Sequence, residues 1–207
     1  MTTNRHTAVT ESIGVILAGG LSSRMGKDKA ALCIDGESLL LRARRTLLAA
    51  GCDRVWLSGR PRVDWSDTSI PDRLPAAGPV GGIMSVLQEA VADSMAAKQV
   101  LFVPVDAPLL SPELLASLLR VAQGDGDGAR TPASPLPVVL KTTEAVLQRC
   151  EQVFADLESG RSCSVKRFIE PLNLFEIDHT DAIASQLINV NTPAQWEGLL
   201  HELEIRT

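Results

Sequence analysis

The sequence has no long apolar run, no secretory signal and no excess of basic residues. No apolar stretch approaches the ~20 residues that a membrane span needs. The first twelve residues, MTTNRHTAVTES, lack the apolar segment of a secretory signal. The 20 lysines and arginines are outnumbered by 25 aspartates and glutamates, which gives a net charge of −5 and argues against binding of nucleic acid. We therefore expect a cytoplasmic protein that acts on neither nucleic acid nor a membrane.

Cysteine and histidine are scarce and scattered. The four cysteines show no CxxC spacing, and the three histidines lie far from one another in the sequence. The pattern therefore predicts neither a structural zinc site nor a set of disulfides. The cysteines are expected to act mainly as small buried apolar residues.

Strand-length apolar runs alternate with helix-length amphipathic segments, which is typical of an α/β fold with a mostly parallel sheet flanked by helices. With 207 residues the chain fits a single domain over 13–207, preceded by a disordered tail over 1–12. The segment GDGDGAR is predicted to be a mobile surface turn. Strands are expected at 13–17, 54–58, 100–105, 136–140 and 174–177, and helices at 40–50, 80–92, 144–157, 163–169, and from residues 112 and 193 onward.

The stretch GVILAGGLSSRMGKDKAAL places a glycine pair and three cations directly after the first predicted strand. Ligands of open α/β sheets bind at the carboxyl ends of the strands, and this loop is the usual phosphate cradle. Gly19 and Gly20 let backbone N–H groups approach an anion closely. Arg24, Lys27 and Lys29 add positive charge. The spacing fits neither a Walker loop nor a dinucleotide fingerprint, so we predict a different kind of phosphate-binding loop.

One stretch, LAGGLSSRMGKDKA, resembles the LAGG-x-S-x-RMG-x-DK signature of the molybdenum cofactor guanylyltransferases, a family of the nucleotidyltransferase superfamily. PAAGPVGGI, VPVDAPLL, PLPVVL and INVNTPAQW resemble later motifs of that family, in the same order. The resemblance covers about residues 13 to 200. It implies a Rossmann-like nucleotidyltransferase domain that transfers GMP from GTP to the phosphate of molybdopterin and releases pyrophosphate.

The resemblance assigns catalytic roles to three charged residues. Lys29 would hold the triphosphate, and Arg24 would offset the charge that builds on the departing pyrophosphate. Asp106, at the end of the most apolar strand, would bind a magnesium ion that bridges it to the GTP phosphates. The alternative for Lys29 and Arg24 is a solvated loop cation, and the alternative for Asp106 is a carboxylate that caps the turn before Pro108.

Two asparagines form a further candidate pair. Asn189 and Asn191 flank Val190 and should project on the same side of an extended segment. Similar asparagines of the family lie near the metal and the phosphates. A pair placed before Thr192-Pro193 is equally suited to hydrogen bonds within a turn.

The nucleotide and the pterin have further candidate contacts from the same resemblance. The base pocket is expected to use the backbone of the glycine loop together with Asp72 and the loop that follows it, while Ser58 stands where some relatives have an asparagine near the nucleoside. Arg161, Lys166 and Arg167 are candidates for pterin contact, although they also fit an exposed helix face. The predicted nucleotide-binding set is Leu17, Ala18, Gly19, Gly20, Lys29, Ser58, Asp72, Gly78 and Asp106.

Three other functions fit the same motifs. Cytidylyl transfer to the same cofactor and nucleotidyl transfer to a sugar phosphate keep the chemistry and change the substrates. A non-catalytic nucleotide-binding adaptor would instead hand the cofactor to a recipient enzyme. Cofactor-synthesis proteins and recipient molybdoenzymes are expected partners. Gly19 favours GTP over CTP, because cytidylyl-transferring relatives resemble LAAG at this point.

Overall fold

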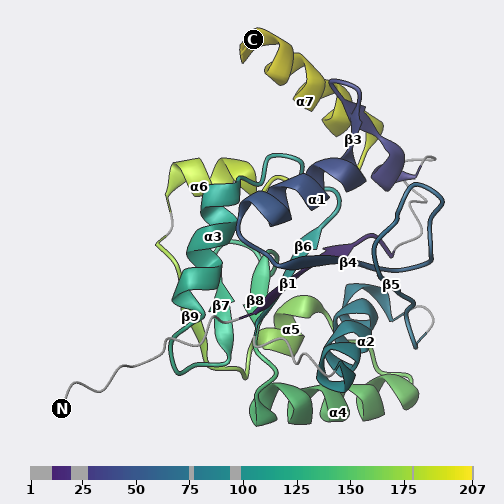
Figure 1. The fold of residues 1–207 in the computed structure, drawn as a ribbon, viewed down its shortest axis with the longest axis vertical. Helices are drawn as coiled ribbons and strands as arrows, with labels where there is room; N and C mark the ends of the chain where they lie inside the picture. The colour runs from purple at the N-terminus through teal and green to yellow at the C-terminus, as the bar shows by residue number, and fades with distance from the viewer. Residues whose placement is uncertain (1–10, 20–27, 75–76, 94–98, 179, 207) are drawn as a thin grey trace.

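The computed structural model describes residues 11–19, 28–74, 77–93, 99–178 and 180–206. The sequence-based fold class is confirmed, since a seven-stranded sheet lies between two layers of helices (Figure 1). Within the described residues, no helix is long and apolar enough to cross a membrane. Most of the predicted tail lies outside the described residues. The sheet consists, in order, of β5 (Ser69–Ile70), β4 (Arg54–Ser58), β1 (Ser12–Leu17), β6 (Gln99–Pro104), β8 (Val138–Leu140), β7 (Gly128–Arg130) and β9 (Leu174–Glu176).

The central strands are parallel and buried on both faces. β1 pairs in parallel with β4 on one side and β6 on the other, and β8 is antiparallel to both of its neighbours. Alternate residues of β1 and β6 contact opposite helix layers: Val15 and Phe102 face one layer, and Ile16 and Leu101 face the other. The continuous apolar runs seen in the sequence follow from this double burial.

The helices cover the sheet in two layers (Figure 1). Most helices begin at a serine or threonine whose side chain accepts a hydrogen bond from a backbone N–H of the first turn, as Ser111 does for Leu114. One layer holds α1 (Leu39–Ala49), α3 (Pro112–Val121), α6 (Asp181–Gln186) and α7 (Pro193–Arg206), together with the short helix η1 (Lys29–Ala31) and the hairpin of β2 (Cys33–Ile34) and β3 (Glu37–Ser38); the other holds α2 (Gly78–Ala92), α4 (Glu144–Glu158) and α5 (Val165–Ile169).

The segment GDGDGAR differs from its prediction as a mobile surface turn. Its last three residues form β7, which pairs with β8 and β9. The Asp127 carboxylate fixes the turn, because it accepts hydrogen bonds from the Thr143 hydroxyl (2.6 Å) and from the backbone N–H of Asn173 (2.9 Å). The prediction was wrong for Gly128–Arg130, because the partners that determine the strand come from distant parts of the sequence.

Candidate active site

The candidate site lies where β1 and β6 end side by side. The chain passes from β1 outward to β4 and β5, and then returns to place β6 on the other side of β1. Such a reversal of strand order leaves a crevice at the carboxyl ends of the strands. Backbone hydrogen bonds bring the ends together: the Val105 amide donates to the Leu17 carbonyl (3.3 Å), and the Ala18 amide donates to the Ser58 carbonyl (3.1 Å).

Three predicted site residues from distant parts of the chain meet at this edge. The Lys29 ammonium donates to Asp106 Oδ2 at 2.7 Å and to Asn191 Oδ1 at 2.6 Å. The side chains of Lys29 and Asp106 are only 16% and 17% exposed. One cation therefore lies between a carboxylate and an amide oxygen, in a position largely screened from water.

Lys29 is held in place by the short helix that it begins. The Asp28 carboxylate caps η1 by accepting a hydrogen bond from the Ala30 amide at 3.0 Å. Arg62 pairs with the other oxygen of Asp28 at 2.5 Å. The two contacts hold the backbone that carries Lys29, and the signature does not reveal the contact with Arg62.

Asn191 makes turn hydrogen bonds with its backbone and contacts Lys29 with its side chain. Its backbone amide donates to Gln195 Oε1 at 2.8 Å, and Thr192 and Gln195 form a reciprocal cap at the start of α7. The neighbouring Val190 amide donates to the Asp106 carbonyl at 2.8 Å. The backbone thus makes the turn while the side chain faces Lys29. Asn189 is exposed and makes no hydrogen bond with Lys29 or Asp106.

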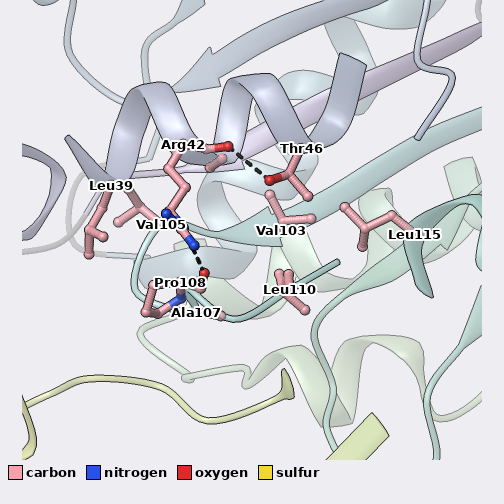
Figure 2. A pocket seen from close by; sticks show the side chains of 10 residues that line it. Leu39, Arg42, Thr46, Val103, Val105, Ala107, Pro108, Leu110 and Leu115 are labelled. Carbon is pink, nitrogen blue, oxygen red and sulfur yellow. Dashed lines mark hydrogen bonds between the residues drawn. The ribbon is translucent and has the colours of Figure 1, made fainter. Parts of the chain in front are cut away.

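Arg42 on α1 binds the loop that follows Asp106. Arg42 Nε donates to the Pro108 carbonyl at 3.0 Å, and the Arg42 carbonyl accepts from the Thr46 hydroxyl (Figure 2). The two contacts border a small, mostly apolar hollow between α1, the end of β6 and α3. Sequence analysis missed this arginine, because nothing in the pattern of α1 distinguishes it from Arg44 and Arg45.

A second group of predicted residues meets on the other side of β1, around Asp72. A side chain at Gly19 would place its Cβ 3.0 Å from Asp72 Oδ2, so the glycine leaves room for the carboxylate. Asp72 Oδ1 is buried and accepts no hydrogen bond from the described residues. Burial raises the pKa of Asp72, and the hydroxyl of Ser58 acts in the opposite direction. Within the part of the chain that the structure describes, this carboxylate oxygen therefore has no donor.

We expect Asp72→Asn to stabilise the nucleotide-free protein near pH 8, by a margin that shrinks as the pH falls. Because burial raises the pKa of Asp72, the folded state binds this proton at a higher pH than the unfolded chain does. Folding is thus penalised above that pKa, and the penalty disappears as the carboxyl is protonated. Thermal unfolding across pH tests this, with Asp125→Asn, at an exposed position, as the control. A variant less stable than the wild type near pH 8 would contradict it.

The other predicted residues lie away from Lys29 and Asp72 or outside the described residues. Gly20 and Arg24 lie outside the described residues. Gly78 begins α2 with a φ of +63°. Among the pterin candidates, Arg161 pairs with Asp156 at 2.5 Å, and Lys166 and Arg167 are exposed on α5, in the layer opposite Lys29.

Comparison with known proteins identifies the family. Residues 14–184 match the model of the MobA-like NTP transferase domain. The chain belongs to this family. It is 36% identical over 190 residues to the molybdenum cofactor guanylyltransferase of Xanthomonas euvesicatoria, covering 91% of this chain and 94% of that protein. It is 32% identical over 193 residues to the probable molybdenum cofactor guanylyltransferase of Chloroflexus aggregans, covering 87% and 89%.

Solved structures of MobA-like and related proteins share the fold. The molybdopterin-guanine dinucleotide biosynthesis protein A of Archaeoglobus fulgidus superposes with a TM-score of 0.70 at 16% identity, covering 94% of this chain and all of that one. A 4-diphosphocytidyl-2C-methyl-D-erythritol synthase from Anaerococcus prevotii superposes with a TM-score of 0.63 at 10% identity, covering 94% and 99%. At these identities the likeness concerns the fold alone. The family resemblance seen in the sequence is confirmed, and the chain is a nucleotidyltransferase.

Proposed function

We propose that this MobA-like protein transfers GMP from GTP to the phosphate of molybdopterin and releases pyrophosphate. The observation that carries the proposal is the convergence of Asp106 and Asn191 on one cation beside the loop that follows β1. Relatives that align over nearly the whole chain carry the name of this activity. The expected cytoplasmic location remains a prediction, as do cofactor-synthesis proteins and recipient molybdoenzymes as partners.

The oxygens around Lys29 suit a magnesium ion. Asp106 Oδ2 and Asn191 Oδ1 already converge on a cation, the Lys29 ammonium, and hard oxygens are the ligands that magnesium prefers. Among the described residues, no three His, Cys, Asp or Glu side chains cluster into a metal site. Phosphate oxygens of the nucleotide would therefore complete the shell, as is usual for magnesium. We propose that Asp106 and Asn191 hold the ion while Lys29 turns to the triphosphate. Bound magnesium supplies neutralisation of the phosphate charge.

The reaction requires positioning more than proton transfer. The attacking oxygen belongs to a phosphate that is already ionised at neutral pH, so no general base is needed. A bond forms between this oxygen and the α-phosphorus of GTP, and the bond from the α-phosphorus to the pyrophosphate oxygen breaks. Catalysis then consists of holding the two phosphates in line and offsetting negative charge. Lys29, and Arg24 by its place in the signature, supply positive charge for this task.

Asp72 provides the acceptor that a guanine base needs. Guanine presents an N1–H and an adjacent amino group, and both must find acceptors in a buried pocket. Asp72 Oδ1 is buried and receives no hydrogen bond from any described residue, and Asp72 Oδ2 faces Gly19. An alanine at residue 19 would place its methyl carbon 3.0 Å from that oxygen and force the carboxylate to shift. Gly19 and Asp72 together therefore favour guanine.

We expect GTP to bind at least about tenfold more tightly than CTP or ATP, since each buried polar group left unpaired costs about 1–3 kcal/mol. Competition of unlabelled nucleotides for one labelled nucleotide in the presence of magnesium measures the preference. Formation of the guanine dinucleotide from GTP and molybdopterin tests the transfer itself. Equal displacement by CTP and GTP would reject the guanine assignment and favour cytidylyl transfer. Nucleotide binding with no transfer to molybdopterin would favour the adaptor or a sugar-phosphate substrate.

A further inference from the structure

Arg42, near the start of α1, reaches across to the loop that carries Asp106. Its side chain is 26% exposed, and its stem lines the apolar hollow shown in Figure 2. Arg42 Nε donates to the Pro108 carbonyl at 3.0 Å. The guanidinium also lies 4.0 Å from the Glu37 carboxylate, whose closer partner is Arg45 at 2.9 Å. The hydrogen bond to Pro108 is therefore the shorter of these two contacts and sets the direction of the side chain.

The loop after β6 is held from two sides. On one side, the Asp106 carbonyl accepts a hydrogen bond from the backbone N–H of Val190, in the segment before α7, at 2.8 Å. On the other side, the Pro108 carbonyl accepts from Arg42. The two donors thus restrain the short stretch of backbone from which the Asp106 carboxylate reaches Lys29.

α1 is also bound to the segment that carries Lys29. The backbone N–H of Leu39, the first residue of α1, donates to the Leu32 carbonyl at 2.7 Å, and the Leu32 N–H donates to the Lys29 carbonyl at 3.1 Å. One end of α1 therefore joins the segments that carry both partners of the Lys29–Asp106 ion pair. Its backbone holds the lysine side, and Arg42 holds the aspartate side.

We propose that Arg42 is a positioning residue for the metal site, whose hydrogen bond to the Pro108 carbonyl holds Asp106 where its carboxylate can share a cation with Asn191. The inference rests on the proposed function and adds to it a residue that acts through the backbone of the loop. The role requires an N–H donor and not a positive charge, because the acceptor is a neutral carbonyl. A neutral side chain with a donor in the same place should therefore serve as well.

Two substitutions separate the donor from the charge. Glutamine places its Nε2 the same number of bonds from the backbone as arginine Nε, so Arg42→Gln keeps an N–H donor and loses the charge. Methionine places a methyl group there, so Arg42→Met loses both and keeps an apolar stem beside the hollow. Arg44→Met is the matched control, because Arg44 lies on the same helix and pairs with Asp67, before β5, at 2.5 Å.

Backbone hydrogen exchange measures the restraint on the loop without nucleotide or metal. The Val190 N–H reports on it, because its acceptor is the Asp106 carbonyl. We expect this N–H to exchange about five- to tenfold faster in Arg42→Met, and at the wild-type rate in Arg42→Gln and Arg44→Met. The N–H groups of α4, in the opposite helix layer, should keep their wild-type rates. An equal increase in both places would overturn the inference, because it would indicate a general loss of stability.

Manganese binding tests the consequence for the metal site. The titration is made without nucleotide in Lys29→Met, where no ammonium competes for the Asp106 and Asn191 oxygens. Adding Arg42→Met should weaken manganese binding about five- to tenfold, as expected for the loss of one hydrogen bond, and adding Arg42→Gln or Arg44→Met should change it by less than about twofold. Guanosine binding should be unaffected by all three, because the base is proposed to lie on the other side of β1.

The outcomes separate this inference from the proposed function. If Lys29→Met binds no manganese and the wild type transfers no GMP, the proposed function fails and the inference falls with it. If the metal binds and Arg42→Met changes neither hydrogen exchange nor manganese affinity, Arg42 does not position the loop and the proposed function stands. Equal losses in Arg42→Met and Arg42→Gln would assign the effect to the charge of Arg42, which would also overturn the inference alone.

Discussion

Asp106→Asn should lower the rate of guanylyl transfer by at least about a hundredfold while the protein remains folded. The substitution preserves the shape of the side chain but removes the negative charge proposed to retain magnesium, which is worth several kcal/mol in the transition state. The fold should survive because an amide oxygen still accepts from Lys29, and because the Asp106 carbonyl keeps the hydrogen bond from the Val190 amide. Product formation is measured across a magnesium titration, with circular dichroism of each sample.

A matched control shows whether charge at this edge of the sheet is what matters. Asp125→Asn makes the same chemical change in the turn after α3. This turn lies at the amino ends of the parallel strands, away from Asp106, so activity should be unchanged. Partial recovery of Asp106→Asn at high magnesium would indicate weakened binding of the ion. Full activity at ordinary magnesium concentrations would remove Asp106 from the proposed metal site.

The sequence predicts the fold well where elements are long and buried on both faces. The run VLFVPV could be assigned to a central strand because both faces of β6 contact helix layers. The hairpin of β2 and β3, the edge strand β5 and the short helix α6 were missed. These elements have two to six residues, which is too few to show a periodicity, and contacts with the rest of the molecule determine them.

The individual site residues were easier to predict than their arrangement. The signature identified Lys29, and the later motifs VPVDAPLL and INVNTPAQW contained Asp106 and Asn191. The contact of the Lys29 ammonium with both Asp106 and Asn191 could not be predicted. Lys29 and Asn191 are 162 positions apart, and only the fold brings them together. The same holds for Arg42, whose partner is a backbone carbonyl 66 positions away.

Lys29→Met should have two effects of opposite sign. Binding of GTP with magnesium should weaken about 10- to 100-fold, because hydrogen bonds to charged groups contribute about 1.5–3 kcal/mol. Binding of guanosine should change little, since the base is held elsewhere. Binding of a divalent ion without nucleotide should become tighter, because the Lys29 ammonium contacts the two oxygens proposed to hold the ion and must leave them before the ion can enter. Methionine has a side chain of similar length to lysine and removes the competing positive charge.

The opposite signs make this substitution the sharper test of how Lys29 works. Calorimetric titration with GTP, guanosine and manganese, a spectroscopically visible substitute for magnesium, measures all three affinities. Lys141→Met is the matched control, because Lys141 donates to the Gly124 carbonyl at the far edge of the sheet. Equal losses for GTP and guanosine would place Lys29 in the fold or at the base instead of at the phosphates. Weaker GTP binding with no gain in manganese affinity would show that the ammonium does not compete for the metal position, and that Asp106 and Asn191 serve only to orient the lysine.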